Sequence, residues 1–267
     1  MELSHRLIET SGYDRPGFAD TYERFRPRMP KALVDVLCRY ARIERPSLVV
    51  DLGCGTGLST RAWSSVARRV IGVEPNEAML AAAAPASGVV YRQAYAQETG
   101  LDDDIADIVT CSQSLHWMDP EVTFAEAARI LRPGGVFAAY DYDWPPVVDP
   151  EVDEAFSAYQ GRRAEVRRRR GLERGGDVWP KEGHLERMRA SGRFRYCREV
   201  LLHSIEDGDA DRIVGFARSL GLPVADMRDE ELERELQIEE LERVARRVLG
   251  DRTVPFLFGY RVRVGIV

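Results

Sequence analysis

Three alternate glycines, Gly53, Gly55 and Gly57, follow a short apolar run and precede a helix-like segment. Glycine is needed where a backbone turns sharply and where a ligand lies against the main chain, because a Cβ atom would clash there. Glu74 ends the next apolar run, 21 residues after Gly53. A carboxylate in that place can accept hydrogen bonds from both hydroxyls of a ribose. The spacing therefore predicts a site for a ligand that contains a nucleoside.

The charge beside this glycine loop selects among such ligands. Asp51 lies just before the loop, where a carboxylate repels a pyrophosphate but favours a ligand that carries an ammonium and a sulfonium. The dinucleotide fingerprint spaces its glycines G-x-G-x-x-G, and here Leu58 stands where the third of them belongs. The pattern favours an adenosyl sulfonium over NAD, and an NAD-dependent oxidoreductase is kept as the alternative.

Polar side chains follow the fourth apolar run of this region, at Ser112, Gln113 and His116. In an open α/β sheet the ligand lies beyond the carboxyl ends of the strands, so we expect Ser112 and Gln113 beside its reactive group. His116 is a candidate general base, because a neutral imidazole can take a proton from an oxygen or nitrogen atom near pH 7. The alternative is a loop histidine with no catalytic role.

Aromatic residues follow the fifth run, at Tyr140, Tyr142 and Trp144. They are predicted to face the substrate, because such rings can hold a planar or hydrophobic molecule, with core packing as the alternative. Asp141 and Asp143 in the same stretch can be interpreted as magnesium ligands, but we predict no metal site.

The elements that position these residues follow from hydrophobic periodicity. Short apolar runs alternate with amphipathic segments from Ser47 to about Tyr142, which is typical of βα units in a parallel sheet. The predicted strands are 47–51, 70–74, 89–93, 107–112 and 136–141, and the predicted helices are 58–69, 76–84 and 121–131. Residues 193–204 and 254–264 alternate as half-exposed strands do, with a charged helix at 229–249 between them. We expect an α/β fold: a doubly wound, Rossmann-like, mostly parallel seven-stranded sheet with helices on both faces.

The composition changes after Trp144 to a polar, arginine-rich stretch that is too long for a simple connection in a compact sheet. We predict a single domain over 1–267, in which 18–142 is the cofactor-binding core, 145–192 a helical insertion after the fifth strand, and 193–267 the closing strands and helices. The insertion is interpreted as a substrate lid, with Trp179 facing the substrate. His184 and His203 have no motif around them and are predicted to lie at the surface.

The net charge of −6 has the wrong sign for a protein that binds mainly nucleic acid phosphates. An arginine cluster at 162–163 and 167–170 is interpreted as a solvated helix face, because only Lys31 and Lys181 among the 38 basic residues are lysines. Neither a membrane-spanning run nor a secretory leader is found, so we expect a cytoplasmic protein without a membrane partner. The oligomeric state is left open.

The four cysteines are far apart in the sequence and form no C-x-x-C pair. This spacing predicts neither a disulfide framework nor a zinc site. They are Cys38, Cys54, Cys111 and Cys197.

Several stretches taken together resemble the class I S-adenosylmethionine-dependent methyltransferases, and most closely the small-molecule enzymes of the type 11-like family. The resemblance spans roughly residues 18–142. Its motifs are the first glycine motif at 50–57, the ribose-acid motif at 70–80, the adenine segment at 94–101, and the segments around the later strands at 110–119 and 130–137.

The resemblance implies methyl transfer from S-adenosylmethionine to a small-molecule acceptor by in-line displacement, with S-adenosylhomocysteine as the product. It implies that Tyr22 lies near the methyl group, with a candidate catalytic role, and that Arg26 is available for the methionine carboxylate. A non-catalytic protein that only binds the cofactor is a further alternative. The other cofactor contacts that it implies are Cys54, Pro75, Met79, Ala96 and Gln97.

Overall fold

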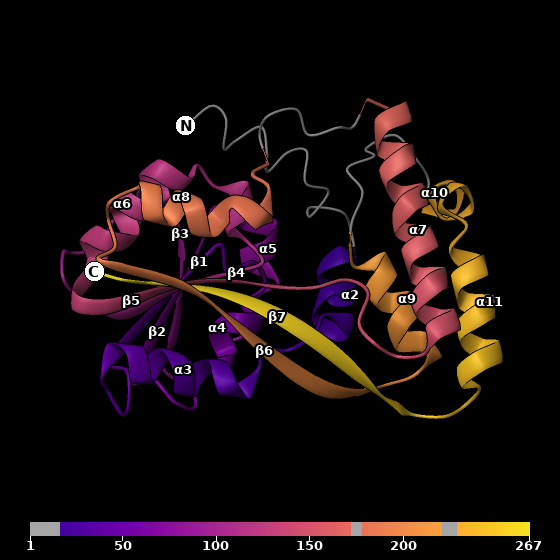
Figure 1. Cartoon of the computed structure of the whole chain (residues 1–267), viewed down its shortest axis with the longest axis horizontal. Helices are drawn as coiled ribbons and strands as arrows, with labels where there is room; N and C mark the ends of the chain where they lie inside the picture. The colour runs from indigo at the N-terminus through magenta and orange to yellow at the C-terminus, as the bar shows by residue number, and fades with distance from the viewer. Residues whose placement is uncertain (1–16, 172–177, 221–228) are drawn as a thin grey trace. The chain divides into compact units, whose positions relative to one another are not determined.

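The computed structural model describes residues 17–171, 178–220 and 229–267 (Figure 1). The chain forms two compact units. The sheet unit comprises Arg28–Tyr142, Gly176–Leu202 and Tyr260–Val267. The helical unit comprises Met1–Pro27, Asp143–Gly175 and His203–Gly259.

Seven strands form one sheet in the order β3-β2-β1-β4-β5-β7-β6. Strands β3, β2, β1, β4 and β5 are parallel to their neighbours, and β7 runs antiparallel to β5. The predicted mostly parallel, seven-stranded Rossmann-like sheet is confirmed. The strands are β1 Leu48–Leu52, β2 Arg69–Glu74, β3 Val89–Gln93, β4 Ala106–Ser112, β5 Leu131–Tyr142, β6 Tyr196–Gly208 and β7 Val254–Ile266.

Helices cover both faces of this sheet, as expected. Figure 1 shows α3 (Lys31–Ala41) and α4 (Leu58–Ala62) on one side of the strands and α6 (Pro120–Ile130) and α8 (His184–Ala190) on the other. A further helix, the short α5 (Glu77–Ala81), follows β2. The Asn76 side chain caps its first turn by accepting a hydrogen bond from the Met79 amide. The cap begins a helix directly after the strand that carries Glu74.

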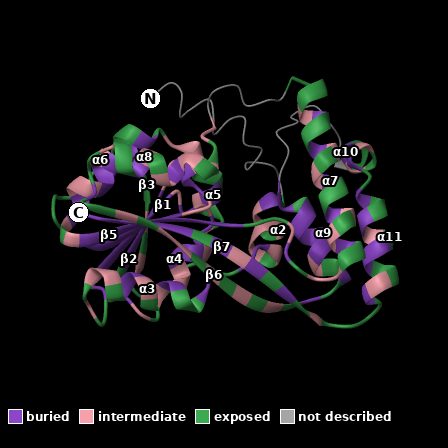
Figure 2. Cartoon of the chain, in the orientation of Figure 1, coloured by how far each residue is buried: buried purple, intermediate pink, exposed green. Residues whose placement is uncertain are grey.

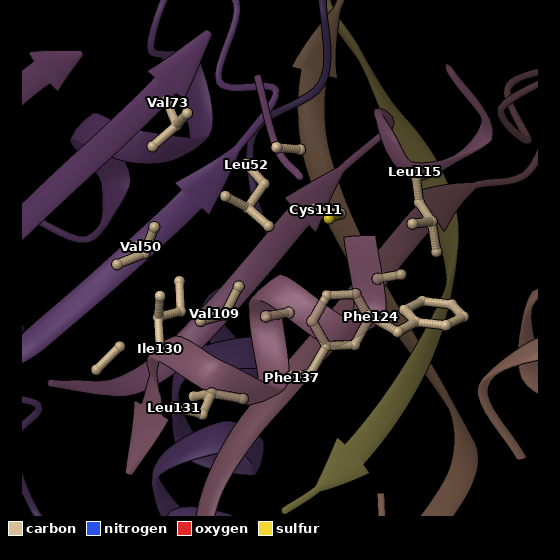
Figure 3. Packing of buried hydrophobic residues seen from close by; sticks show 14 of the residues in the cluster. Val50, Leu52, Val73, Val109, Cys111, Leu115, Phe124, Ile130, Leu131 and Phe137 are labelled. Atoms are coloured by element: carbon tan, nitrogen blue, oxygen red, sulfur yellow. The ribbon is translucent and has the colours of Figure 1, made fainter. Parts of the chain in front are cut away.

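The main core lies between strands β1, β4 and β5 and helix α6 (Figure 3). Three rings, of Phe124, Phe137 and Phe194, pack with centroids 5.4 to 5.7 Å apart. All five residues of β1 are buried, and Figure 2 shows most of the central strands as buried. Strands covered on both faces need continuous apolar runs, which is the pattern that the sequence shows.

Three predicted helices differ from the observed ones. The helix predicted at 76–84 is the shorter α5, and the helix predicted at 58–69 ends early as α4. After Ala62 the chain leaves α4 in turns with three-residue spacing, such as Ser64 N to Arg61 O at 3.1 Å. The Ser64 hydroxyl also donates to Arg61 O at 2.7 Å and so competes with the helical pattern. The predicted helix 229–249 is two helices, α10 (Asp229–Leu236) and α11 (Ile238–Leu249), because Gln237 between them has a left-handed backbone with φ of 53°.

The helical unit contains α2 (Phe18–Phe25), α7 (Pro150–Arg169), α9 (Ala210–Arg218), α10 and α11. Helix α7 follows the fifth strand, so the predicted helical insertion after that strand is confirmed. Phe156 of α7 stacks on Phe216 of α9 with centroids 5.5 Å apart. The Tyr159 hydroxyl donates to Ala217 O at 2.9 Å, which fixes the same two helices together.

Two members of the arginine cluster form hydrogen bonds within the protein, and the expectation of a solvated helix face is wrong for the buried Arg163. Arg163 is buried and donates to Leu220 O at 2.6 Å. Arg162 donates to Leu236 O at 2.9 Å, at the carboxyl end of α10. Carbonyls at helix ends lack partners within the helix, and these guanidinium groups supply them.

No helix in the three described stretches is both long enough and apolar enough to cross a bilayer.

Candidate active site

The glycine loop connects β1 to α4. Gly53, Gly55 and Gly57 have φ values of 67°, 56° and 80°, which lie in the left-handed region that favours glycine. The amides of Gly53 and Cys54 both donate to Val73 O, at 2.8 and 3.1 Å. The loop is therefore fixed to the end of β2 by its backbone.

Protein side chains already fill the space beside two of these glycines. A Cβ atom on Gly53 would lie 2.6 Å from the Cβ of Ser114, and one on Gly57 would lie 2.2 Å from the Tyr91 hydroxyl. At Gly55 the nearest atom is Cε of Met79 at 3.2 Å. The sequence suggests that these glycines allow a ligand to approach closely. Internal packing is a second reason for glycine at these positions.

Glu74 holds the loop from β2. Its Oε2 accepts from the Gly55 amide at 3.0 Å and its Oε1 from the Asn76 amide at 2.9 Å. Burial raises the pKa of this carboxyl, while the two backbone hydrogen bonds lower it and the charge of Asp51 raises it further. A carboxylate has about four acceptor positions, so each oxygen can accept a second hydrogen bond. The arrangement fits a pair of ribose hydroxyls.

Asp51 lies beneath the loop and is fully buried. Its Oδ2 accepts from the hydroxyls of Ser59 and Thr60 at 2.6 and 2.7 Å, and its Oδ1 accepts from Thr110 at 2.8 Å. Burial raises the pKa of Asp51, and the three hydroxyls oppose that rise. The carboxylate joins β1, α4 and β4 through these three hydrogen bonds.

The segment predicted to contact adenine is held by a network that sequence reasoning missed. Glu126 of α6 accepts from the amide and the hydroxyl of Thr99, at 2.9 and 2.5 Å. Arg129 donates to both oxygens of Glu126 at 2.8 Å. Burial alone would raise the pKa of Glu126, but the hydrogen bonds from Arg129 and Thr99 outweigh it and lower the pKa. The three-residue spacing of Glu126 and Arg129 on a predicted helix was the available signal. Ala96, in the same segment, is buried.

The end of β4 carries a residue with unusual backbone geometry. Gln113 has φ of 54°, which is uncommon for a residue other than glycine. Its amide donates to Tyr140 O at 3.0 Å. Its Oε1 accepts from Nζ of Lys181 at 2.6 Å, and the same Nζ lies 2.7 Å from Oδ1 of Asp141. Sequence reasoning did not single out Lys181.

A chain of ion pairs continues from Asp141 across the sheet. Arg263 of β7 is buried and places Nη1 2.9 Å from Oδ2 of Asp141 and Nε 2.9 Å from Oε2 of Glu199 on β6. Asp141 is therefore neutralised by cations. Within the described stretches, no three or more His, Cys, Asp or Glu residues gather as metal ligands.

His116 and Trp179 are brought together in the sheet unit. The Trp179 amide donates to His116 O at 2.9 Å. The Arg187 guanidinium lies 5.4 Å from the centroid of the Trp179 ring. The segment before α8 is thus fixed to the loop that begins with Gln113, directly after Ser112 at the end of β4.

His184 is not at the surface, and that prediction is wrong. Its side chain is fully buried at the start of α8, and Nδ1 lies 2.9 Å from Nη2 of Arg187. Burial lowers the pKa of His184 to about 4. His203, predicted to be exposed, is exposed.

The remaining predicted residues divide between the two units. Tyr22 and Arg26 belong to the helical unit, where Arg26 donates to Ser219 O at 2.6 Å and its guanidinium lies 4.6 Å from the Tyr22 ring centroid. Trp144 belongs to the same unit. In the sheet unit, Met79, Cys54, Tyr140 and Tyr142 are buried, and Pro75, Gln97 and Ser112 are half-buried.

Known proteins resemble this chain in sequence and in fold. A family model described as a methyltransferase domain matches residues 50–139. The Saccharomyces cerevisiae protein named "Probable S-adenosylmethionine-dependent methyltransferase CRG1" is 31% identical over 147 residues, which are 52% of this chain and 50% of the relative. The uncharacterized methyltransferase Rv3342 of Mycobacterium tuberculosis is 39% identical over 117 residues, 43% of this chain and 46% of that protein.

Solved structures extend the similarity over most of the chain. One from Anaeromyxobacter dehalogenans, named provisionally as a type II methyltransferase, is 26% identical, covers 91% of this chain and 98% of its own, and has a TM-score of 0.67. The chain spans about half the length of the curated relatives that it matches.

Proposed function

We propose that this chain, which is similar to S-adenosylmethionine-dependent methyltransferases in sequence and in fold, is a class I member of them and transfers a methyl group to a small-molecule acceptor by in-line displacement. The main support for this proposal is the hydrogen bond between Glu74 and the glycine loop. Glu74 binds the Gly55 amide at 3.0 Å, so the acid for the ribose and the loop for the backbone contacts form one preorganised element.

The residues present fit this cofactor. Glu74 keeps acceptor positions for ribose hydroxyls, and the buried charge of Asp51 favours the cationic amino-acid end. The side-chain nitrogen of Gln113 is buried and has no hydrogen-bond partner among the described residues. An unsatisfied buried donor is costly, and a ligand oxygen would supply the missing partner.

Bound S-adenosylmethionine supplies an electrophilic methyl group on a sulfonium. The protein's main task is alignment and exclusion of water. The loop after β4 and the segment before α8 carry the groups for it. His116 in the loop is the proposed general base for an acceptor that must lose a proton, and Trp179 in the segment is the proposed wall of the acceptor site. The net charge of −6 supports a small molecule over nucleic acid as the acceptor.

Calorimetric titration of the purified protein with S-adenosylhomocysteine and with NAD tests the cofactor. We expect micromolar affinity for S-adenosylhomocysteine and none for NAD. Glu74→Gln should weaken the affinity for S-adenosylhomocysteine by roughly 10- to 100-fold, because it removes charge-assisted hydrogen bonds. The exposed Glu77 gives the control, Glu77→Gln, which should bind as the wild type does. Affinity for NAD alone would reverse the assignment.

Turnover and the base are tested separately. Incubation of the protein with S-adenosylmethionine and a cell extract, followed by mass spectrometry, should show methylated small molecules; their absence would favour a binding protein without catalysis. With an acceptor in hand, His116→Ala should slow single-turnover methyl transfer by about 100-fold or more if the imidazole takes the proton. A rate within a few-fold of the wild type, with cofactor affinity intact, would remove His116 as the base.

A further inference from the structure

Lys181 fixes which way the side-chain amide of Gln113 points. Its Nζ donates to Oε1 of Gln113 at 2.6 Å and lies 2.7 Å from Oδ1 of Asp141. An ammonium group has donors only, so it selects the amide oxygen and turns the amide nitrogen away from itself. Asp141 is itself fixed by the buried Arg263 at 2.9 Å, so the orientation is set by an ion-paired frame.

The amide nitrogen of Gln113 is the feature left to explain. It is buried and has no hydrogen-bond partner in residues 17–171, 178–220 or 229–267. The residue that carries it has a left-handed backbone, with φ of 54°, and its main-chain amide is held by Tyr140 O at 3.0 Å. Unusual backbone geometry and unsatisfied donors both concentrate at ligand sites. This amide is therefore oriented toward a hydrogen-bond acceptor that the protein does not supply.

The position of Gln113 identifies the acceptor. Strand β1 lies between β2 and β4, so Glu74 and Gln113 flank the glycine loop from opposite sides. The residue after Gln113, Ser114, donates to Leu52 O at 2.7 Å and packs against Gly53. If the cofactor places its ribose at Glu74 and extends across the glycine loop, its methionine end lies on the β4 side of that loop. That end offers an ammonium, which only donates, and a carboxylate, which only accepts.

We propose that the side-chain amide of Gln113 donates to the methionine carboxylate of the cofactor and that Lys181 is the positioning residue for this amide. The inference rests on the proposed function and adds a carboxylate-binding residue from the sheet unit. The Lys181 ammonium behind the amide also favours an anion. Arginine does not replace it equivalently, because a planar fork does not fit between two oxygens as a compact ammonium does.

Two ligands and one isosteric variant test the contact. S-adenosylhomocysteine carries the carboxylate, and 5′-methylthioadenosine has the adenosine and the sulfur without the amino-acid part. Gln113→Glu keeps the shape and the Lys181 partner but replaces the donor with an oxygen. By calorimetry we expect this variant to bind S-adenosylhomocysteine at least 10-fold more weakly than the wild type and 5′-methylthioadenosine within twofold of it.

Lysine variants test the positioning role. Lys181→Met and Lys181→Arg should each weaken S-adenosylhomocysteine about three- to tenfold and leave 5′-methylthioadenosine unchanged. The other lysine of the chain, the exposed Lys31, provides the control: Lys31→Met should bind both ligands as the wild type does. Thermal melting shows whether each variant folds. If Gln113→Glu does not fold, the affinities of the two Lys181 variants decide the question.

The contrary results are distinct. Unchanged affinity for S-adenosylhomocysteine in Gln113→Glu and in Lys181→Met would overturn the inference, and so would an equal loss for both ligands, which would indicate a deformed loop. In either case binding by the wild type would leave the proposed function standing. A wild type that binds neither ligand would reject the proposed function and this inference with it.

Discussion

Acid should destabilise this protein through one buried imidazole. The His184 ring has no exposed surface, and its Nδ1 faces Nη2 of Arg187 at 2.9 Å. A guanidinium group can only donate, so Nδ1 must accept, and the ring proton of the neutral imidazole lies on Nε2. Protonation of Nδ1 would remove that hydrogen bond and place a buried cation near Arg187, Arg263 and Lys181.

The size of the effect follows from the shift in pKa. Burial is the main cause of the fall of the His184 pKa from 6.5 to about 4, and the nearby cations add to it while Asp141 opposes it. The folded state binds this proton less readily than the unfolded chain does, so the stabilisation is complete above pH 6.5 and is lost as the pH falls toward 4. At 1.36 kcal/mol per pKa unit the full loss is about 3 kcal/mol, and about 2 kcal/mol is lost by pH 5.

Thermal melting between pH 5 and pH 7.5 measures this loss. For a chain of this size, 2 kcal/mol corresponds to about 4–8 °C in Tm. His184→Asn keeps an acceptor oxygen near the Nδ1 position but does not titrate. Between pH 7.5 and pH 5 the Tm of this variant should therefore fall about 4–8 °C less than the Tm of the wild type. His203 is exposed, so His203→Asn is the control, and its Tm should depend on pH as the wild-type Tm does. Parallel melting profiles for the wild type and His184→Asn would refute the reasoning.

Three further predictions concern the loop and its supports. Asp51→Asn should lower the free energy of unfolding by about 2–3 kcal/mol in urea, because an amide nitrogen cannot accept from the hydroxyls now bound to the carboxylate; no loss would show that those hydroxyls find other partners. Gly53→Ala should lower the free energy of unfolding by about 2 kcal/mol or more, because position 53 has a left-handed backbone and the new Cβ would meet Ser114. The control Gly161→Ala, at an uncrowded position in α7, should be neutral or stabilising. Equal melting temperatures of the two variants would contradict this. The affinity for S-adenosylhomocysteine should decline as the pH falls toward the raised pKa of Glu74, and Glu74→Gln should flatten that part of the profile; an identical profile in the variant would assign the titration to another group.

The sheet and the glycine loop were predictable because their signals are local. The apolar runs of β1 and β4 mark buried strands, and the glycines and Glu74 belong to consecutive βα units. A pattern that repeats within about 25 residues can be interpreted without knowing the rest of the chain. The end of α4 was not predictable in this way, because the competing hydrogen bond from Ser64 has no periodic signature.

The ion-paired frame of the candidate site was not predictable, since its partners come from distant parts of the chain. Lys181 and Gln113 are 68 residues apart, and Arg263 and Asp141 are 122 residues apart. Only the pairing of β5 with β7 brings the second pair together. The burial of His184 has the same origin, because helix α8 packs against α6 and no sequence motif surrounds the histidine. Long-range contacts of this kind depend on the whole fold.

The carbonyl of Val73 accepts from both Gly53 and Cys54, and the neighbouring Glu74 side chain holds Gly55. Anyone who transplants this nucleoside-binding loop into another scaffold must therefore transplant the tip of β2 along with it. A donor peptide limited to the glycines would arrive without the acceptors that shape it. The smallest portable module is discontinuous in sequence and spans two adjacent strands.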